Sequence, residues 1–401
     1  MRIAERSEKT PKPKGLRTVG LFAGIGGLEL GLRRAGHVAV DLCEIDPVAT
    51  AVLKERFPRA RLISDVQDYQ KLPSGADLLT AGFPCQDLSQ AGHTLGLDDG
   101  NSRSGLVGEV IRLLLSHDPK WVLLENVPFM LHLARGKSLD VLLSALEDLG
   151  FSWAYRVVNS LAFGVPQRRE RVYLLASRRE DPRSVILTDD YGEPAPRTWT
   201  PDLAVGFYWT EGRGGLGWAV DAIPTLKSGS TIGIPSPPAI VMPDGEVVTP
   251  GIRDAERFQG FDADWTLPAN EWRAGRDRWR LVGNAVTVNV AQWIGERLLQ
   301  PTPYLGIFDT PLPDGAKWPS AAYNVGEGRF YAQVSKWPIM VQRPHLHEFI
   351  CKTEAKPLSR RAIAGFLARY HAGSLRKSAR FLEMLAAHQT RMETLYRESA
   401  A

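Results

Sequence analysis

Apolar runs and helix-forming stretches alternate along residues 17–180, and this alternation constrains the fold more than any other feature of the sequence. The runs RTVGLFAG (17–24), ADLLTAGF (76–83) and ERVYLLAS (170–177) are nearly continuous in apolar residues, as expected of strands buried on both faces. Amphipathic patterns such as GGLELGLRRAG (26–36) separate them. Strands separated by helices predict an α/β fold with a doubly wound, mostly parallel sheet.

Further segments extend this pattern. Two more strands are expected at 37–46 and 120–126, and helices at 47–56, 105–116 and 137–150. Beyond residue 180 the composition of the sequence changes: proline, glycine and tryptophan are frequent, and no helical period persists. We therefore expect a disordered basic tail (1–15), a catalytic domain (16–180), a smaller irregular β-rich domain (181–280), a helix returning to the catalytic domain (281–300), and a basic, partly helical C-terminal extension (301–401).

Composition narrows the class of protein. The 401 residues are 44% hydrophobic and 23% charged, which fits a soluble globular enzyme. We find no run of about 18 apolar residues and no apolar N-terminal signal. The three cysteines, Cys43, Cys85 and Cys351, lie far apart, which predicts a reducing, cytoplasmic setting with neither disulfides nor a zinc or other metal site.

Charge gives a weaker indication. The net charge is +4, and residues 301–401 hold 14 Lys and Arg against 8 Asp and Glu, a net of +6. A basic C-terminal segment is compatible with a phosphate-rich partner, and a solvated helical surface explains the charge equally well.

A glycine-rich turn follows the first predicted strand, with Gly24, Gly26 and Gly27 leading into the first helix. Such a turn lets a ligand approach the backbone, although a tight turn alone would also need glycine. Glu44 ends the second strand, where a carboxylate can accept hydrogen bonds from ribose hydroxyls, and Asp65 follows the third, where it could accept from an adenine amino group. The pattern Gly-Lys-Ser/Thr of a phosphate-binding loop is absent, so a nucleoside cofactor without phosphates, such as S-adenosylmethionine, fits better than ATP.

Reactive groups follow the other predicted strands. Cys85 lies in GFPCQDLS after the strand 76–83, where Pro84 restricts the backbone. Glu125 ends the next strand, and PQRRERVYLL supplies Arg169 and Arg171. Singly, each has a plain structural explanation: a packed cysteine, a helix cap, a solvated arginine run. Together, a thiol, a carboxyl and arginines at one sheet edge predict a reaction centre beside the cofactor.

Eight ordered motifs resemble the DNA (cytosine-5)-methyltransferases of bacteria, the family of restriction-modification enzymes. These are LFAGIGG, CEID, SDVQD, GFPCQDLSQAG, LLENV, PQRRERVYLL, RDAERFQGF and GNAVTVNVA, and they span residues 18 to about 298, roughly three-quarters of the chain. The resemblance implies transfer of a methyl group from S-adenosylmethionine to C5 of a cytosine flipped out of duplex DNA, giving S-adenosylhomocysteine. It also implies a cytoplasmic, nucleoid-associated protein that acts as a monomer on DNA, beside a cognate restriction endonuclease or as an orphan modifier.

The resemblance also implies roles for individual residues. Cys85 would add to C6 of the cytosine, Glu125 would hold or protonate N3, and Arg171 would contact the base carbonyl. Arg169 is assigned with the catalytic residues and is expected to meet backbone phosphate, and Gln86 and Ser89 would contact DNA. The implied cofactor residues are Phe22, Gly24, Gly26, Glu44, Ile45, Asp65, Val66, Pro84 and Asn284.

The domain of residues 181–280 would read the DNA sequence, and its TLKSGST segment resembles a part that supports base flipping. The extension after 300 would add DNA contacts, with partner docking as the alternative. Other functions stay open: a tRNA-methylating enzyme of the same fold, a catalytically silent DNA-binding protein, or a nicotinamide-dependent dehydrogenase. The tRNA branch usually has proline where Phe83 stands, and a dehydrogenase does not explain the Pro84-Cys85-Gln86 sequence.

Overall fold

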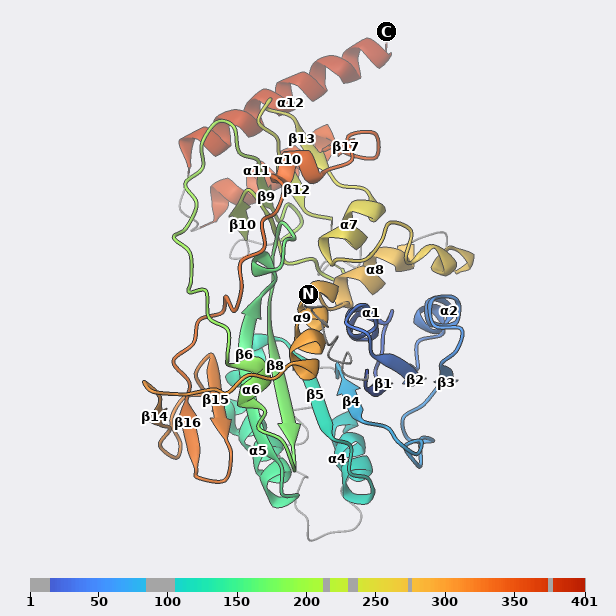
Figure 1. The fold of residues 1–401 in the computed structure, drawn as a ribbon. Coiled ribbons are helices and arrows are strands. Elements are labelled where there is room, and N and C mark those ends of the chain that lie inside the picture. Colours follow the sequence, from blue (N-terminus) through green and yellow to red (C-terminus); the bar gives the residue numbers. More distant parts are fainter. Residues whose placement is uncertain are drawn as a thin grey trace, which may run out of the picture.

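The computed structural model describes residues 15–83, 105–211, 217–229, 237–272, 276–373 and 378–400. Apart from Gly15, the tail expected over residues 1–15 lies outside these ranges, as do Pro84, Cys85, Gln86 and Ser89. A ten-stranded sheet with helices on both faces forms one end of the molecule, and a smaller five-stranded sheet lies at the other (Figure 1).

The large sheet has the strand order β14-β16-β15-β6-β8-β5-β4-β1-β2-β3. It is parallel from β3 to β5 and antiparallel beyond β5, where β8 lies between β5 and β6. The expected doubly wound α/β fold is thus confirmed, in a sheet that is mixed overall. The strands are β1 (Arg17–Leu21), β2 (Val38–Cys43), β3 (Arg61–Ile63), β4 (Leu78–Ala81), β5 (Trp121–Asn126), β6 (Ser152–Asn159), β8 (Glu170–Ser177), β14 (Thr310–Pro311), β15 (Ala321–Asn324) and β16 (Arg329–Tyr331).

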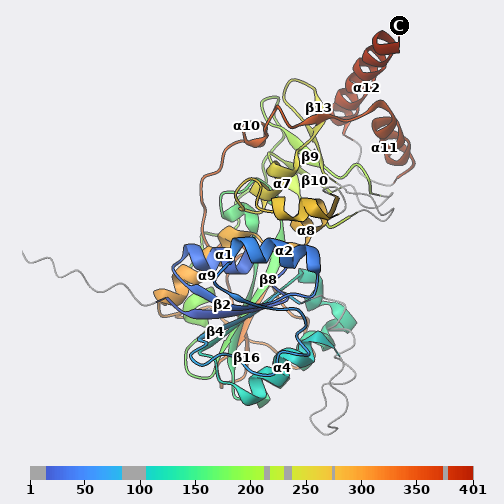
Figure 2. The same ribbon diagram turned by 90° about the vertical axis from the view of Figure 1, so that its right-hand side faces the viewer.

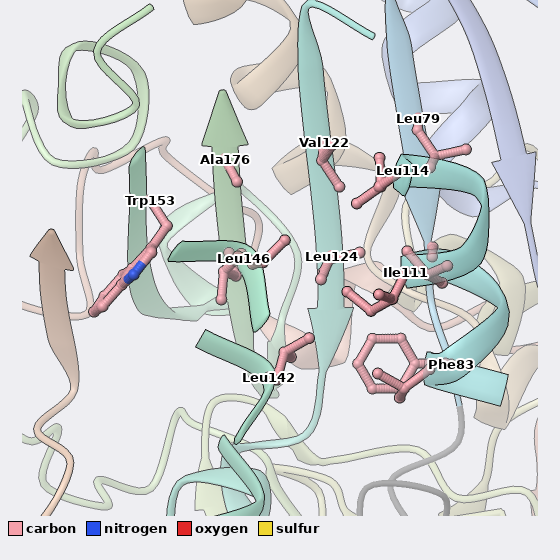
Figure 3. Close-up of a cluster of buried hydrophobic side chains, with 14 of the residues drawn as sticks. Leu79, Phe83, Ile111, Leu114, Val122, Leu124, Leu142, Leu146, Trp153 and Ala176 are labelled. Atoms are coloured by element: carbon pink, nitrogen blue, oxygen red, sulfur yellow. The ribbon is translucent and has the colours of Figure 1, made fainter. Parts of the chain in front are cut away.

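Helices cover both faces of this sheet (Figure 2). On one face, α4 (Leu106–Ser116) and α5 (Lys137–Asp148) pack against alternate residues of the central strands, as Figure 3 shows for Leu114, Val122, Leu124 and Leu146. On the other face lie α1 (Gly27–Arg34), α6 (Arg183–Ile186) and α9 (Val288–Leu299). Because both faces are covered, β4 and β5 are buried along their whole length, which explains their nearly continuous apolar sequences.

The small sheet combines the middle of the chain with its C-terminal segment. Its order is β10-β9-β12-β13-β17, with β9 (Val205–Phe207), β10 (Trp218–Val220), β12 (Ala239–Val241), β13 (Val247–Thr249) and β17 (Lys356–Pro357). The helices α11 (Arg360–Ala372) and α12 (Ala379–Ala400) pack on it through Phe366, Phe381 and Leu385. The buried His388 joins α12 to the sheet, since its Nδ1 accepts from Val247 N–H (3.1 Å) and its Nε2 contacts the Leu358 carbonyl (3.0 Å).

This arrangement differs from the expected division at residues 180, 280 and 300. Segments after 300 extend the large sheet by β14–β16 and complete the small sheet by β17, so they do not form a separate module. Their strands of two to four residues are too short to show a period in the sequence. The helix expected over 281–300 is interrupted, because α8 (Arg276–Asn284) ends before α9 begins.

The remaining elements connect these layers. Among the described residues they are α2 (Pro47–Arg56), α7 (Ile252–Phe258), α10 (Leu346–Phe349), the paired short strands β7 (Gln167–Arg168) and β11 (Ile223–Pro224), and the 3₁₀ helices η1 (Pro128–Leu131), η2 (Leu133–Gly136), η3 (Ser160–Ala162) and η4 (Leu267–Glu271). Across the described ranges, no helix combines the length and apolar character needed to cross a membrane.

Candidate active site

A cavity of about 470 Å³ opens at the carboxyl ends of the parallel strands. The turn after β1 lines it with Phe22 and Gly24, and segments after the neighbouring strands add carboxylates and apolar side chains. Its lining includes most of the residues that the sequence assigned to a cofactor and to the reaction: Phe22, Gly24, Glu44, Ile45, Asp65, Val66, Glu125, Arg171 and Asn284. This is the edge where ligands bind in doubly wound sheets.

The glycine turn is held by Glu44. Its Oε2 accepts from Gly24 N–H (2.7 Å) and its Oε1 from Asp46 N–H (2.8 Å), so one carboxylate ties the turn after β1 to the start of α2. Burial raises the pKa of Glu44, and these backbone bonds oppose the shift. Gly26 is not among the cavity residues; it is the N-cap of α1 with φ of 80°, and a Cβ there would lie 2.4 Å from the Phe57 ring.

The other assigned cofactor residues lie around the same cavity. Asp65 accepts from Gln67 N–H (2.9 Å) through Oδ1, and Val66 is buried beside it. Ile45 is 71% exposed at the cavity, so it offers an apolar face to a ligand. Asn284 is the last residue of α8, and it lines the same cavity.

Glu125 and Arg171 form the polar pair of the site. They come from the antiparallel neighbours β5 and β8, and Arg171 Nε lies 3.2 Å from Glu125 Oε1. Glu125 is 8% exposed. Burial raises its pKa, while the positive charges of Arg171 and Arg169 oppose this shift. A carboxyl in this state can hold a proton for, or accept one from, a ring nitrogen.

The position of the Arg169 side chain differs from the one expected for a contact with DNA phosphate. The side chain is 1% exposed and donates to three backbone carbonyls: Leu226 (3.0 Å), Gly283 (3.3 Å) and Ala285 (2.6 Å). Because the guanidinium is enclosed, it does not lie on a surface that a DNA backbone could reach. In this structure Arg169 joins the segment around Leu226 to the α8–α9 turn.

Phe83 is the last described residue before the segment that bears Cys85. Phe83 is buried in the core beneath α4 (Figure 3), and its carbonyl accepts from Asn126 Nδ2 (2.9 Å) at the end of β5. The candidate residues Pro84, Cys85, Gln86 and Ser89 all follow it and lie outside the described residues. The chain therefore enters this segment from an anchor beside Glu125.

Sequence reasoning missed several polar residues that line the cavity, among them Glu29, Asn126 and Arg280. Arg280 Nη1 contacts Asp46 Oδ2 (2.6 Å), which links α8 to the start of α2. Asn126 directly follows Glu125, and its position at a strand end was the available signal. No signal in the sequence indicated Glu29, because a glutamate in an amphipathic helix is ordinarily expected to face solvent.

The fold and the cavity define the class of Rossmann-like methyltransferases. Residues 16–202 match the family model of C-5 cytosine-specific DNA methylases. The chain is 48% identical over 368 residues to the Type II methyltransferase M2.BsuMI of Bacillus subtilis, a match covering 88% of this chain and 93% of that protein.

Two shorter matches are also to Type II methyltransferases. The Type II methyltransferases M.HgiBI of Herpetosiphon aurantiacus and M.HhaI of Haemophilus parahaemolyticus are each 35% identical, over 46% and 41% of this chain and 42% and 50% of their own lengths. The chain belongs to the C-5 cytosine-specific DNA methylases and is a DNA (cytosine-5) methyltransferase.

Proposed function

We propose that this enzyme uses S-adenosylmethionine to methylate C5 of a cytosine flipped out of a specific duplex DNA sequence, through a covalent bond between Cys85 and C6. The observation that carries the proposal is the cavity itself, which is lined by Glu44 and Asp65 as well as by the Glu125–Arg171 pair. One cavity thus offers acceptors for a nucleoside cofactor and a polar pair for a base.

The cavity fits this cofactor. Glu44 and Asp65 offer acceptors to ribose hydroxyls and an adenine amino group, and Phe22, Ile45 and Val66 offer apolar contacts to the purine. The lining arginines are already paired with carboxylates, Arg171 with Glu125 and Arg280 with Asp46, so the cavity offers no evident phosphate ligand among the described residues. When bound, S-adenosylmethionine supplies an electrophilic methyl group.

The chain's own residues would then activate the base. Cytosine C5 is a weak nucleophile, and addition of the Cys85 thiolate to C6 moves electron density onto C5. Glu125 would hold N3 as charge develops there, and Arg171 would keep Glu125 in place and contact the base carbonyl. After C5 carries the methyl group, loss of its proton to a base and expulsion of the thiolate restore the aromatic ring and the free enzyme.

Target reading is proposed for the small sheet and the segment around Leu226. Flipping a base costs a few kcal/mol, which contacts outside the cavity must offset. Gln86 and Ser89 remain candidates for such contacts. The similarity to a Type II methyltransferase over most of the chain supports a role in restriction-modification, with a cognate endonuclease as partner.

The test is transfer of labelled methyl groups to duplex DNA or to tRNA. We expect label in DNA with the wild type, none with Cys85→Ser, and normal label with the matched control Cys351→Ser, which alters a thiol far along the chain. Transfer that survives Cys85→Ser would refute the covalent step, and transfer to tRNA alone would refute the substrate. Bisulfite sequencing of DNA from expressing cells would then identify the target sequence.

A further inference from the structure

Glu29 is an enclosed acid that lines the cofactor cavity and that the mechanism above does not use. It lies in the first turn of α1 and is 2% exposed. Its Oε1 accepts from Thr80 Oγ1 (3.0 Å) on β4, whereas its Oε2 is buried without a hydrogen-bond partner. Buried polar atoms are nearly always paired in folded proteins, so an unpaired carboxylate oxygen beside a ligand cavity calls for a partner.

The strand beneath Glu29 is shaped to admit it. Gly20 on β1 faces the carboxyl, and a Cβ at that position would lie 2.3 Å from Glu29 Oε1 and 3.0 Å from Leu42 Cδ2. Only glycine leaves space there for the acid between α1 and the sheet. The Gly20–Glu29 pair therefore brings a carboxyl from the helix to a position that a side chain of β1 would otherwise occupy.

Within the part of the chain that the structure describes, no side chain supplies a cation to Glu29. Its pKa is raised to about 7, first by burial and further by the charge of Glu44, against its own backbone N–H and Thr80. The two arginines that line the cavity are paired elsewhere, Arg171 with Glu125 and Arg280 with Asp46. The titratable and charged groups that share the cavity with Glu29 are Cys43, Glu44, Asp46, Asp65, Glu125, Arg171 and Arg280.

We propose that Glu29 binds the α-ammonium group in the amino-acid part of S-adenosylmethionine and of its product; this inference rests on the proposed function. The cofactor has two cationic centres, and they differ in chemistry. An ammonium group has three N–H donors and can satisfy the unpaired Oε2, whereas a sulfonium centre has none. The ammonium persists after methyl transfer, so Glu29 contributes to binding both cofactor and product.

Three ligands separate this role from a structural one. S-adenosylmethionine and S-adenosylhomocysteine both carry the ammonium group, and 5′-methylthioadenosine lacks the amino-acid part altogether. In titration calorimetry at pH 7, we expect Glu29→Gln to lower the affinity for S-adenosylmethionine and for S-adenosylhomocysteine by about tenfold or more. This is the loss expected for a hydrogen bond between charged groups. Binding of 5′-methylthioadenosine should stay unchanged. The matched variant Glu55→Gln, on an exposed part of α2, should bind all three normally.

A second measurement needs no variant. The ammonium pairs with the ionised acid, so wild-type affinity for the two ammonium ligands should rise about tenfold from pH 5.5 to 7, where Glu29 loses its proton. The affinity for 5′-methylthioadenosine should not follow this rise. Glu44 has a raised pKa as well, but any effect at the ribose would appear with all three ligands.

Several results would overturn the inference. Equal weakening of all three ligands by Glu29→Gln would make the residue structural, and unchanged binding would remove its role. Weaker binding of S-adenosylmethionine alone would show that Glu29 interacts with the sulfonium centre and not with the ammonium group. A wild type that binds none of the three ligands would refute the proposed function itself, whereas normal wild-type binding with any of the other results refutes only the role of Glu29.

Discussion

Glu29 should make the ligand-free enzyme less stable as the pH rises, and replacing it should remove that dependence. The folded state holds the proton of Glu29 up to about pH 7, whereas the unfolded chain releases it near 4.5. The folded state therefore binds more protons between these values, and the free energy of unfolding falls with rising pH. Stability from this group is fully present below pH 4.5 and is lost as the pH rises through 7.

The size of the effect follows from the same shift. A rise from 4.5 to about 7 corresponds to about 3 kcal/mol once fully developed, and about 2.5 kcal/mol of it falls between pH 5 and 8. The side chain is 2% exposed, so solvent screening does not reduce this estimate greatly. Glu29→Gln keeps the shape and the contact with Thr80 but cannot ionise. The free energy of unfolding of the variant should therefore increase relative to that of the wild type as the pH increases.

Urea unfolding at pH 5, 6, 7 and 8 without cofactor measures this difference. The gap between Glu29→Gln and wild type should change by about 2.5 kcal/mol in favour of the variant from pH 5 to 8, with equal urea dependence of both proteins. Glu55→Gln should show no such change, because Glu55 is exposed. A gap that stays constant across this range, or that moves toward the wild type, would refute the assignment of a buried, raised-pKa acid.

Two further predictions concern the residues beside the cavity. Glu125→Gln should lower methyl transfer to DNA by about 10²–10⁴-fold, as expected for loss of a general acid or base, while calorimetric binding of S-adenosylmethionine stays within about twofold; a normal transfer rate would contradict the role of the Glu125–Arg171 pair. Arg169→Met should leave the Leu226 and Gly283 carbonyls unpaired, at about 1–3 kcal/mol each. Its melting temperature should fall well below that of the exposed neighbour variant Arg168→Met, and equal melting temperatures would show that these bonds contribute nothing.

The parts of the fold that could be predicted share one physical cause. Strands β1, β4, β5 and β8 are buried on both faces, so their sequences are nearly continuous in apolar residues. Strand β6 was not predicted, because it contains Arg156 in its middle. The fully buried guanidinium of Arg156 donates to the carbonyls of Ser335, Ile186 and Asp189. A sequence does not reveal that distant carbonyls will enclose an arginine.

The same limit applies to the site. Glu44, Asp65 and Glu125 were predicted at the cavity because each lies at or just beyond the end of a parallel strand, and such strand ends meet at one edge. The family resemblance implied that Arg169 meets phosphate, yet its carbonyl partners come from residues 57 to 116 positions later in the chain. Glu29 depends on Gly20 and Thr80, on two different strands, so its enclosure emerges only with the tertiary structure.

The pairing of β13 with β17 has a consequence for protein engineering. Thr249 and Lys356 are 107 residues apart in sequence, yet they lie opposite each other in the small sheet, and α11 and α12 then cover that sheet. A chimera between relatives that exchanges only the central stretch of the chain would leave this sheet without its native edge strand and its apolar cover. A working chimera would need the central stretch and the C-terminal segment with β17, α11 and α12 to come from the same relative.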